Sequence, residues 1–246
     1  QKPVVMAFGR MNPPTVGHEK LINKVHQLAK DYGADHKVIL SHSVDAKKNP
    51  LDAKTKLKHA KRFFPNTNIE TSDKENPTFL HHAAKLFQQG HDHLIMVAGS
   101  DRIKEYEQKL KQYNGTAQGS LFNFKKIEVK SAGQRDPDAE GTEGMSASKM
   151  REHAKNKDFA SFRQGIPSHV SDTHAKDLMN DVRRGMGLNE NINRGLFKAI
   201  FVTGGPGSGK DVILREAIAE QKSVEINSMQ AFEFLADKQK LSEKSS

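Results

Sequence analysis

Short apolar runs alternate with longer amphipathic stretches through the first 130 or so residues of the chain. Each apolar run has the length of a buried strand, and the stretches between the runs repeat apolar residues at helical spacing. The pattern predicts strands at 3–8, 37–42, 67–71, 93–100 and 124–129, and helices at 15–31, 53–64, 77–89 and 102–113. Strands that are separated by helices of this length imply a parallel sheet in an α/β fold.

The pattern changes from residue 146 onward, where three helical stretches follow one another at 146–156, 158–166 and 172–186. A Gly- and Asn-rich segment at 185–195 then predicts a linker. A further apolar run at 196–205 and a helical stretch at 210–221 come after it. We therefore expect a first domain at 1–165, a helical extension and linker at 166–195, and a second, incomplete unit at 196–246.

Composition narrows the function classes. The net charge is +9 and there are no cysteines, which excludes disulfides and thiolate–metal sites. The lysines are scattered without interleaved aromatic residues, so phosphate-rich small molecules are favoured over nucleic acid as partners. No apolar run suits a membrane helix or a signal peptide, which predicts a cytoplasmic protein. The twelve histidines are interpreted as surface or helix-face residues and not as a metal site. The sequence does not decide the oligomeric state, and a homo-oligomer is one of the alternatives.

The sequence "FGRMNPPTVGH" (8–18) places a rigid turn between the first strand and the first helix. Gly9 allows a close turn and Thr15 can cap the helix. The free amides and dipole of a helix start favour an anion, and His18 can donate an imidazole N–H to it. Such a site stabilises charge on a phosphate during nucleotidyl transfer. The alternative is a capped helix with a histidine that only packs.

A second candidate phosphate site is "SASKMR" (146–151), which opens a helix with two hydroxyls and two cations. Ser146, Ser148, Lys149 and Arg151 fall within about a turn and a half of helix and suit a polyphosphate. The alternative is an ordinary serine-capped helix. In "VAGSDR" (97–102), Gly99 and Asp101 follow the most strand-like run, where Asp101 could equally be a helix cap.

These motifs resemble the signatures of the (H/T)xGH nucleotidyltransferase superfamily, "GRMNPPTVGH" the first and "GMSASKMREHA" the second. The resemblance covers roughly residues 3–165. It implies a Rossmann-like sheet and transfer of a nucleoside monophosphate from a triphosphate to a phosphate monoester, with Mg²⁺ and release of pyrophosphate. His18 would stabilise the transferred phosphate, Thr15 would bind a phosphate oxygen in place of the family's first histidine, and Arg151 would bind the β- and γ-phosphates.

The resemblance also implies a set of nucleotide-binding residues: Gly9, Arg10, Gly17, Gly99, Asp101, Ser146, Ser148 and Lys149. Lys48 in "KKNPL" resembles the lysine of an acceptor-binding loop, and no protein ligand for a metal is assigned. ATP and an acceptor such as nicotinamide mononucleotide are the expected substrates. However, "TEGMSAS" (142–148) also resembles cytidylyltransferases, so CTP with a phosphorylated alcohol or sugar is the alternative.

A second phosphate motif, "GGPGSGKD" (204–211), follows a predicted strand and fits the P-loop pattern. Gly204, Gly209 and Lys210 are in register, but Asp211 stands where Ser or Thr would hold Mg²⁺. Only 35 residues follow Asp211, so a truncated or vestigial kinase unit is expected. The combination resembles bifunctional transferase–kinase proteins of nicotinamide salvage and some phage proteins, which would act in the host cytoplasm. A non-catalytic module that binds nucleotide or nucleic acid is the remaining alternative.

Overall fold

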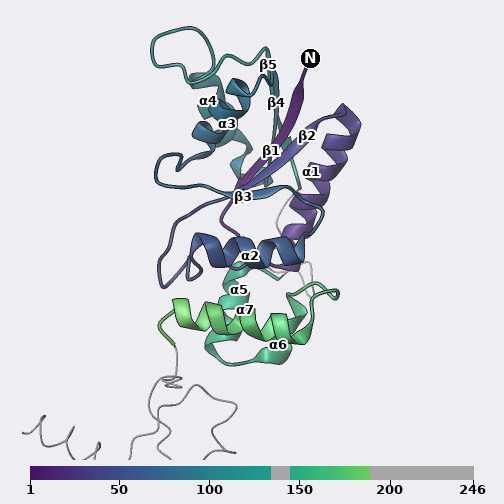
Figure 1. Cartoon of the computed structure of the whole chain (residues 1–246), viewed down its shortest axis with the longest axis vertical. Helices are drawn as coiled ribbons and strands as arrows, with labels where there is room; N and C mark the ends of the chain where they lie inside the picture. The colour runs from purple at the N-terminus through teal and green to yellow at the C-terminus, as the bar shows by residue number, and fades with distance from the viewer. Residues whose placement is uncertain (134–144, 189–246) are drawn as a thin grey trace, which may run out of the picture. The chain divides into compact units, whose positions relative to one another are not determined.

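A five-stranded parallel sheet forms the centre of the computed structural model, which describes residues 1–133 and 145–188 (Figure 1). Its strands are β1 (Pro3–Gly9), β2 (Asp35–Leu40), β3 (Ile69–Thr71), β4 (His93–Ala98) and β5 (Lys126–Ser131). They lie in the order β3-β2-β1-β4-β5, and every neighbouring pair is parallel. This order is that of one Rossmann half, and it reverses direction between β1 and β4, where ligands of such sheets bind. The predicted Rossmann-like α/β class is confirmed.

Helices cover both faces of the sheet because its strands are apolar on both sides. They are α1 (Glu19–Tyr32), α2 (Ala53–Phe63), α3 (Phe79–Gln88) and α4 (Ile103–Gln112). Residues of α1 and α2 pack with Val5 and Val38 in one hydrophobic cluster. Residues of α3 and α4 pack with Val4 and Met96 in another. Figure 1 shows α3 and α4 on the side of the sheet away from α1.

Three further helices, α5 (Ala147–Lys155), α6 (Phe159–Gln164) and α7 (Asp172–Gly185), pack together below α2 (Figure 1). A buried contact joins α2 to α7, where His59 Nε2 lies 2.8 Å from the Asp181 carboxylate. Gly185 at the end of α7 approaches the backbone of Pro50 so closely that a Cβ at this position would clash with the Pro50 carbonyl oxygen. These contacts fix the helices against the loop between β2 and α2.

Two expectations are corrected. The helix expected to start at residue 15 begins as a 3-10 turn, Val16–His18, and the α-helix starts at Glu19. The histidines interpreted as surface or helix-face residues include five that are buried: His59 and His82 lie on helices α2 and α3, whereas His18, His91 and His93 lie outside the α-helices. In the part of the chain that the structure describes, no helix is long and apolar enough to cross a membrane. The expected second unit at 196–246, with Gly204, Gly209, Lys210 and Asp211, lies outside the described residues.

Candidate active site

The loop from β1 to α1 starts at the carboxyl end of the sheet, as expected. The carbonyl of Gly9 accepts a hydrogen bond from the amide of Ser41, the residue that follows the neighbouring strand β2. Asn12 is buried, and its side chain pairs with the Leu51 backbone in both directions: its Nδ2 donates to the carbonyl, and its Oδ1 accepts from the amide, each at 2.9 Å. This pairing fastens the loop to the segment before α2.

The His18 side chain is held by a specific hydrogen bond. Its Nδ1 accepts from the Thr15 backbone N–H at 2.9 Å, which closes the turn that precedes α1. Because Nδ1 is an acceptor there, the proton of a neutral imidazole lies on Nε2. The ring is therefore fixed at the amino end of α1 in the tautomer whose Nε2 is a donor.

Thr15 differs from its expected role as a direct phosphate ligand. Its side chain is fully buried, and its hydroxyl donates to the carbonyl of Met145 at 2.8 Å. The hydroxyl proton is thus committed to the protein backbone. Val16 strengthens the same junction because its amide donates to the Gly165 carbonyl at 2.9 Å. We therefore interpret Thr15 as a positioning residue that ties the first motif to the second.

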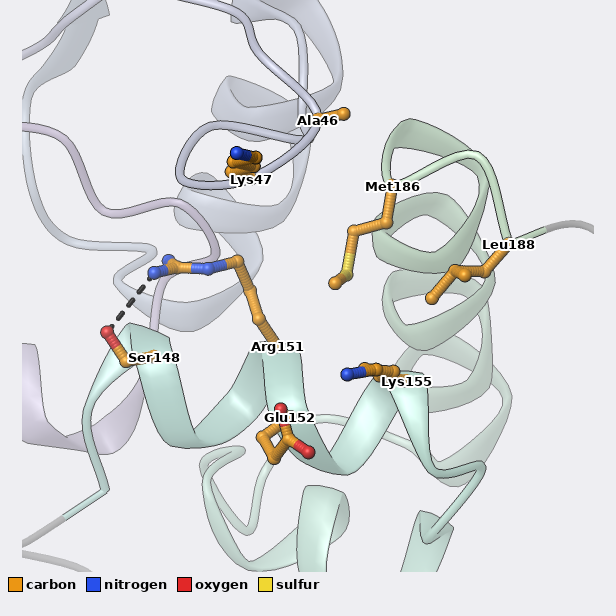
Figure 2. A pocket seen from close by; sticks show the side chains of 8 residues that line it. All are labelled: Ala46, Lys47, Ser148, Arg151, Glu152, Lys155, Met186 and Leu188. Carbon is orange, nitrogen blue, oxygen red and sulfur yellow. Dashed lines mark hydrogen bonds between the residues drawn. The ribbon is translucent and has the colours of Figure 1, made fainter.

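The second motif opens α5 as the sequence predicts. Ser146 is the N-cap, and its Oγ accepts from the Lys149 amide at 3.1 Å. Arg151 donates to the carbonyl of Asn12 at 2.8 Å and to Ser148 Oγ at 3.1 Å; Figure 2 shows the second bond. Burial and the neighbouring Arg10 lower the pKa of Arg151. The structure thus brings His18, Arg151 and Arg10 to one edge of the sheet.

A buried lysine that the sequence analysis missed belongs to this group. Lys56 on α2 has 0% exposure, donates to the Ser41 carbonyl, and has its pKa lowered to about 8 by burial and by the nearby Arg10. No carboxylate of the described residues compensates it. The buried Ser41 hydroxyl beside it has no hydrogen-bond partner among those residues. Asp45 is the carboxylate that acts on Arg151 of this group, and the excess of positive charge at the end of the sheet suits an anionic ligand. The signal for Lys56 is weak because it stands in the lysine-rich stretch 53–64.

The remaining candidate residues, Gly99, Asp101 and Lys48, make fewer contacts with the two motifs. Gly99 and Asp101 lie at the carboxyl end of β4, with Asp101 inside a 3-10 turn instead of at its cap. Asp101 makes no hydrogen bond to either motif within the described ranges. The Lys48 side chain is exposed, and its amide donates to Asp45. The neighbouring Lys47, which was not predicted, lines a pocket with Arg151 and Ser148 instead (Figure 2).

Two glycines of the first loop are distinguishable by experiment. A Cβ on Gly17 would lie 2.7 Å from the Met145 carbonyl oxygen, whereas a Cβ on Gly9 would meet no atom within 4 Å. We expect Gly17→Ala to lower the free energy of unfolding by about 1–3 kcal/mol, as overpacking does. Gly9→Ala should leave denaturant unfolding unchanged but weaken ATP binding about 10-fold, if phosphates approach the backbone there. ATP titration by calorimetry checks this, and equal ATP affinity would remove Gly9 from the site.

One comparison with known proteins bears on this arrangement. A sequence model of the cytidylyltransferase-like family matches residues 6–153, which contain the first motif from Arg10 to His18 and the second through Arg151. A comparison with curated proteins gives no match. Among solved structures, a protein described as a nicotinate-nucleotide adenylyltransferase from Vibrio parahaemolyticus is 14% identical, with a TM-score of 0.45, and the match covers 73% of this chain and 99% of that one.

A second solved structure, TmcAL from Thermotoga maritima bound with alpha-thio ATP, is 12% identical with a TM-score of 0.43. The match covers 76% of this chain and 56% of that one, so this chain corresponds to little more than half of TmcAL. Both TM-scores lie below 0.5, and neither likeness carries an argument about the site. The family match, which spans more than half of the chain and both motifs, does: the chain belongs to the cytidylyltransferase-like family and is a nucleotidyltransferase.

Proposed function

We propose that the chain transfers AMP from ATP to a phosphate-monoester acceptor such as nicotinamide mononucleotide, with release of pyrophosphate. One observation carries the proposal: two phosphate-binding motifs, 130 positions apart, are joined by the Thr15–Met145 hydrogen bond around a group of cations. Arg10 acts electrostatically on both Lys56 and Arg151 there. Among the charged groups of the described residues, Asp45 is the carboxylate that acts on Arg151.

The reaction needs no protein nucleophile. An oxygen of the acceptor phosphate attacks the α-phosphorus in line, and the bond from that phosphorus to the oxygen that bridges to the β-phosphorus breaks. The bonding electrons leave with pyrophosphate, and no proton has to move. The protein orients the two phosphates and neutralises their charge. His18 donates its Nε2–H to the α-phosphate, while Arg151 and Lys56 neutralise the departing phosphates.

Magnesium fits the site as an ion held chiefly by the triphosphate. No group of three or more His, Asp or Glu side chains among the described residues could hold a metal ion. Mg²⁺ commonly binds through substrate phosphates with one or two carboxylates. Asp101, exposed at the carboxyl end of β4, is one carboxylate at that edge of the sheet. When bound, the ion would neutralise charge on the phosphates.

Transfer of CMP to a phosphorylated alcohol or sugar is the second candidate. Two observations favour it: the matching family is cytidylyltransferase-like, and "TEGMSAS" (142–148) resembles the corresponding run of cytidylyltransferases. The motifs themselves bind phosphates, which ATP and CTP share. The base must therefore be identified by assay.

The test is a matrix of substrates with the full chain. Each of the four nucleoside triphosphates is combined with Mg²⁺ and with nicotinamide mononucleotide, nicotinate mononucleotide, phosphopantetheine, phosphocholine or glycerol 3-phosphate, and pyrophosphate release is measured. We expect turnover with ATP and a mononucleotide acceptor. Turnover confined to CTP would establish the second candidate. Absence of turnover, together with salt-sensitive binding of nucleic acid, would replace both with a binding module.

Arg151→Gln provides a matched variant for the same assay. Loss of a charge-assisted bond to phosphate should raise the KM for the triphosphate about 10- to 100-fold. Lys104→Met removes an exposed cation of α4 that makes no hydrogen bond with the described residues and should leave kinetics unchanged. Equal KM values for the two variants would remove Arg151 from the triphosphate site.

A further inference from the structure

Two helices of the described chain, α6 and α7, lie beyond the residues that match the family model, which end at residue 153 within α5 (Figure 1). Neither motif includes them, yet α7 contacts both helices that carry cations of the proposed site. It packs against α5, which carries Arg151, and it is hydrogen-bonded to α2, which carries Lys56. The position of α7 therefore bears on how these two cations are placed.

The contact between α7 and α2 is a buried hydrogen bond. The side chain of His59 on α2 is 1% exposed, and its Nε2 lies 2.8 Å from Oδ2 of Asp181 on α7. Burial lowers the pKa of His59, so the imidazole is neutral at pH 7 and donates its Nε2 proton to the carboxylate. Without this acceptor a buried N–H would have no partner, which is costly. The hydrogen bond thus holds α7 to α2 at one defined point.

Several cations surround this buried pair. Lys58 and Arg62 on α2 act electrostatically on His59. Lys58 and Arg184 also pair with Asp181, at 3.4 and 2.9 Å, but their side chains are 47% and 66% exposed. Exposed ion pairs contribute little compared with a hydrogen bond whose loss leaves a buried donor unpaired. We therefore expect the hydrogen-bond acceptor at Asp181 to matter more than its charge.

Contacts with α7 lie on both sides of Lys56 along the chain. Before it, Gly185 of α7 packs directly against the backbone of Pro50. After it, His59 follows within about one turn of the same helix. Between these two contacts the fully buried Lys56 donates to the Ser41 carbonyl at the end of β2. The segment that directs Lys56 toward the end of the sheet is therefore held by α7 at both ends.

A second set of contacts fixes α7 to α5. Arg183 of α7 donates to the carbonyls of Ala154 and Lys155 at the end of α5, at 2.7 and 3.1 Å, and to that of Leu188 at 3.0 Å. The guanidinium group thereby satisfies carbonyls that the end of a helix leaves without partners. Because Arg151 lies on the same helix, Arg183 ties the second motif to α7.

We propose that α7 positions the two cations of the transfer site, with Asp181 as the positioning residue for Lys56 and Arg183 as the positioning residue for Arg151. The inference rests on the proposed nucleotidyl transfer. Asp181 acts through His59 and α2, and Arg183 acts through the end of α5. Because one helix binds both of the others, it keeps the two cations at the separation that the departing phosphates require.

A double-mutant cycle in the full chain tests the role of Asp181. We expect Asp181→Ala to lower kcat/KM for the triphosphate about 10-fold, and Asp181→Asn, whose Oδ1 can accept from His59, to retain most of the activity. In the Lys56→Met background, Asp181→Ala should change kcat/KM less than about 2-fold, because the side chain that it positions is already absent. Asp177→Ala is the control, since Asp177 is exposed on the same helix and makes no hydrogen bond with the described residues. Equal losses in the two backgrounds would overturn the role of Asp181.

Nuclear magnetic resonance of lysine labelled at its ε-carbon tests the same contact without turnover. The Lys56 signal, assigned by its absence from Lys56→Met, should titrate at about pH 8 in the wild type. If Asp181→Ala lets α2 move and water reach the amino group, the pKa of Lys56 should rise by about 1 or more. Arg10, the charged group that acts on Lys56, is common to both proteins. An unchanged pKa in Asp181→Ala would refute the positioning of Lys56.

Arg183→Met tests the contact with α5 and leaves the buried pair intact. We expect the KM for the triphosphate to rise about 10-fold, with no further increase when Arg183→Met is combined with Arg151→Gln. Additive effects of the two substitutions would remove the positioning role of Arg183. Failure of the proposed function is seen separately, as a lack of triphosphate-dependent pyrophosphate release by the wild type. The titration of Lys56 then still decides whether α7 holds α2 in place.

Discussion

Replacement of His18 by asparagine is expected to lower kcat by about 100-fold or more while leaving the fold intact. The Asn Oδ1 can occupy the position of Nδ1 and accept from the Thr15 amide, so the hydrogen bond that shapes the turn is retained. The donor at the Nε2 position is lost. Because that donor acts on charge that develops in the transition state, the loss falls on kcat more than on the KM of ATP.

His18→Gln is the matched control for this prediction. The amide group of glutamine reaches the region of Nε2, so it replaces the donor and sacrifices the Nδ1 bond. We expect it to retain more activity than His18→Asn and to be less stable to denaturant. Steady-state kinetics and urea unfolding of both variants check the result. The opposite ranking in kcat would mean that His18 serves only to shape the turn.

Replacement of Lys56 by methionine is expected to stabilise the protein while reducing its activity. Holding the pKa of Lys56 at about 8 instead of 10.5 costs about 3 kcal/mol of folding free energy near neutral pH. Methionine removes this cost but leaves the Ser41 carbonyl without its donor, a loss of about 1 kcal/mol. We expect a net gain of about 2 kcal/mol and a fall in kcat/KM of about 10-fold or more.

The pH dependence makes this prediction specific. The pKa of Lys56 is lower in the folded than in the unfolded chain, so the unfolded chain binds more protons between pH 8 and 10.5. Below about pH 8 the wild type is therefore less stable than Lys56→Met by the full amount, and this difference narrows as the pH rises toward 10.5.

Wild-type activity should decline above about pH 8 as Lys56 loses its proton, and Lys56→Arg should not show that decline. Urea unfolding and kinetics at pH 7, 8.5 and 10 check both effects. A methionine variant that is less stable and fully active would contradict the assignment.

Much of the fold could be predicted because its strands are nearly continuous apolar runs, as in His93–Ala98, where every residue is buried. The two motifs were recognisable because glycine, proline and hydroxyl residues cluster at strand–helix junctions. Lys56 was not recognisable, because a lysine among other lysines gives no sign of which one faces the interior. The hydrogen bond from the Thr15 hydroxyl to the Met145 carbonyl also could not be predicted from the sequence, because it joins two distant segments of the chain.

The burial of His59 could not be predicted from the sequence either. His59 stands in a polar helix, and only the approach of α7 brings Asp181 to its ring and buries it. Burial lowers the pKa of His59, and the Asp181 contact opposes that effect. Its surroundings are thus set by a residue more than a hundred positions away, whereas hydropathy patterns report only local neighbours.

The hydrogen bond from Val16 to Gly165 has a consequence for synthesis of the chain. The five strands are all complete by residue 131, so a growing chain can assemble its sheet while the partners of Thr15, Val16 and the Asn12 carbonyl have yet to be translated. The loop that carries His18 gains these partners only after the chain has been extended from Ser131 as far as Gly165. A nascent polypeptide would thus acquire its architecture well before it could acquire a working site.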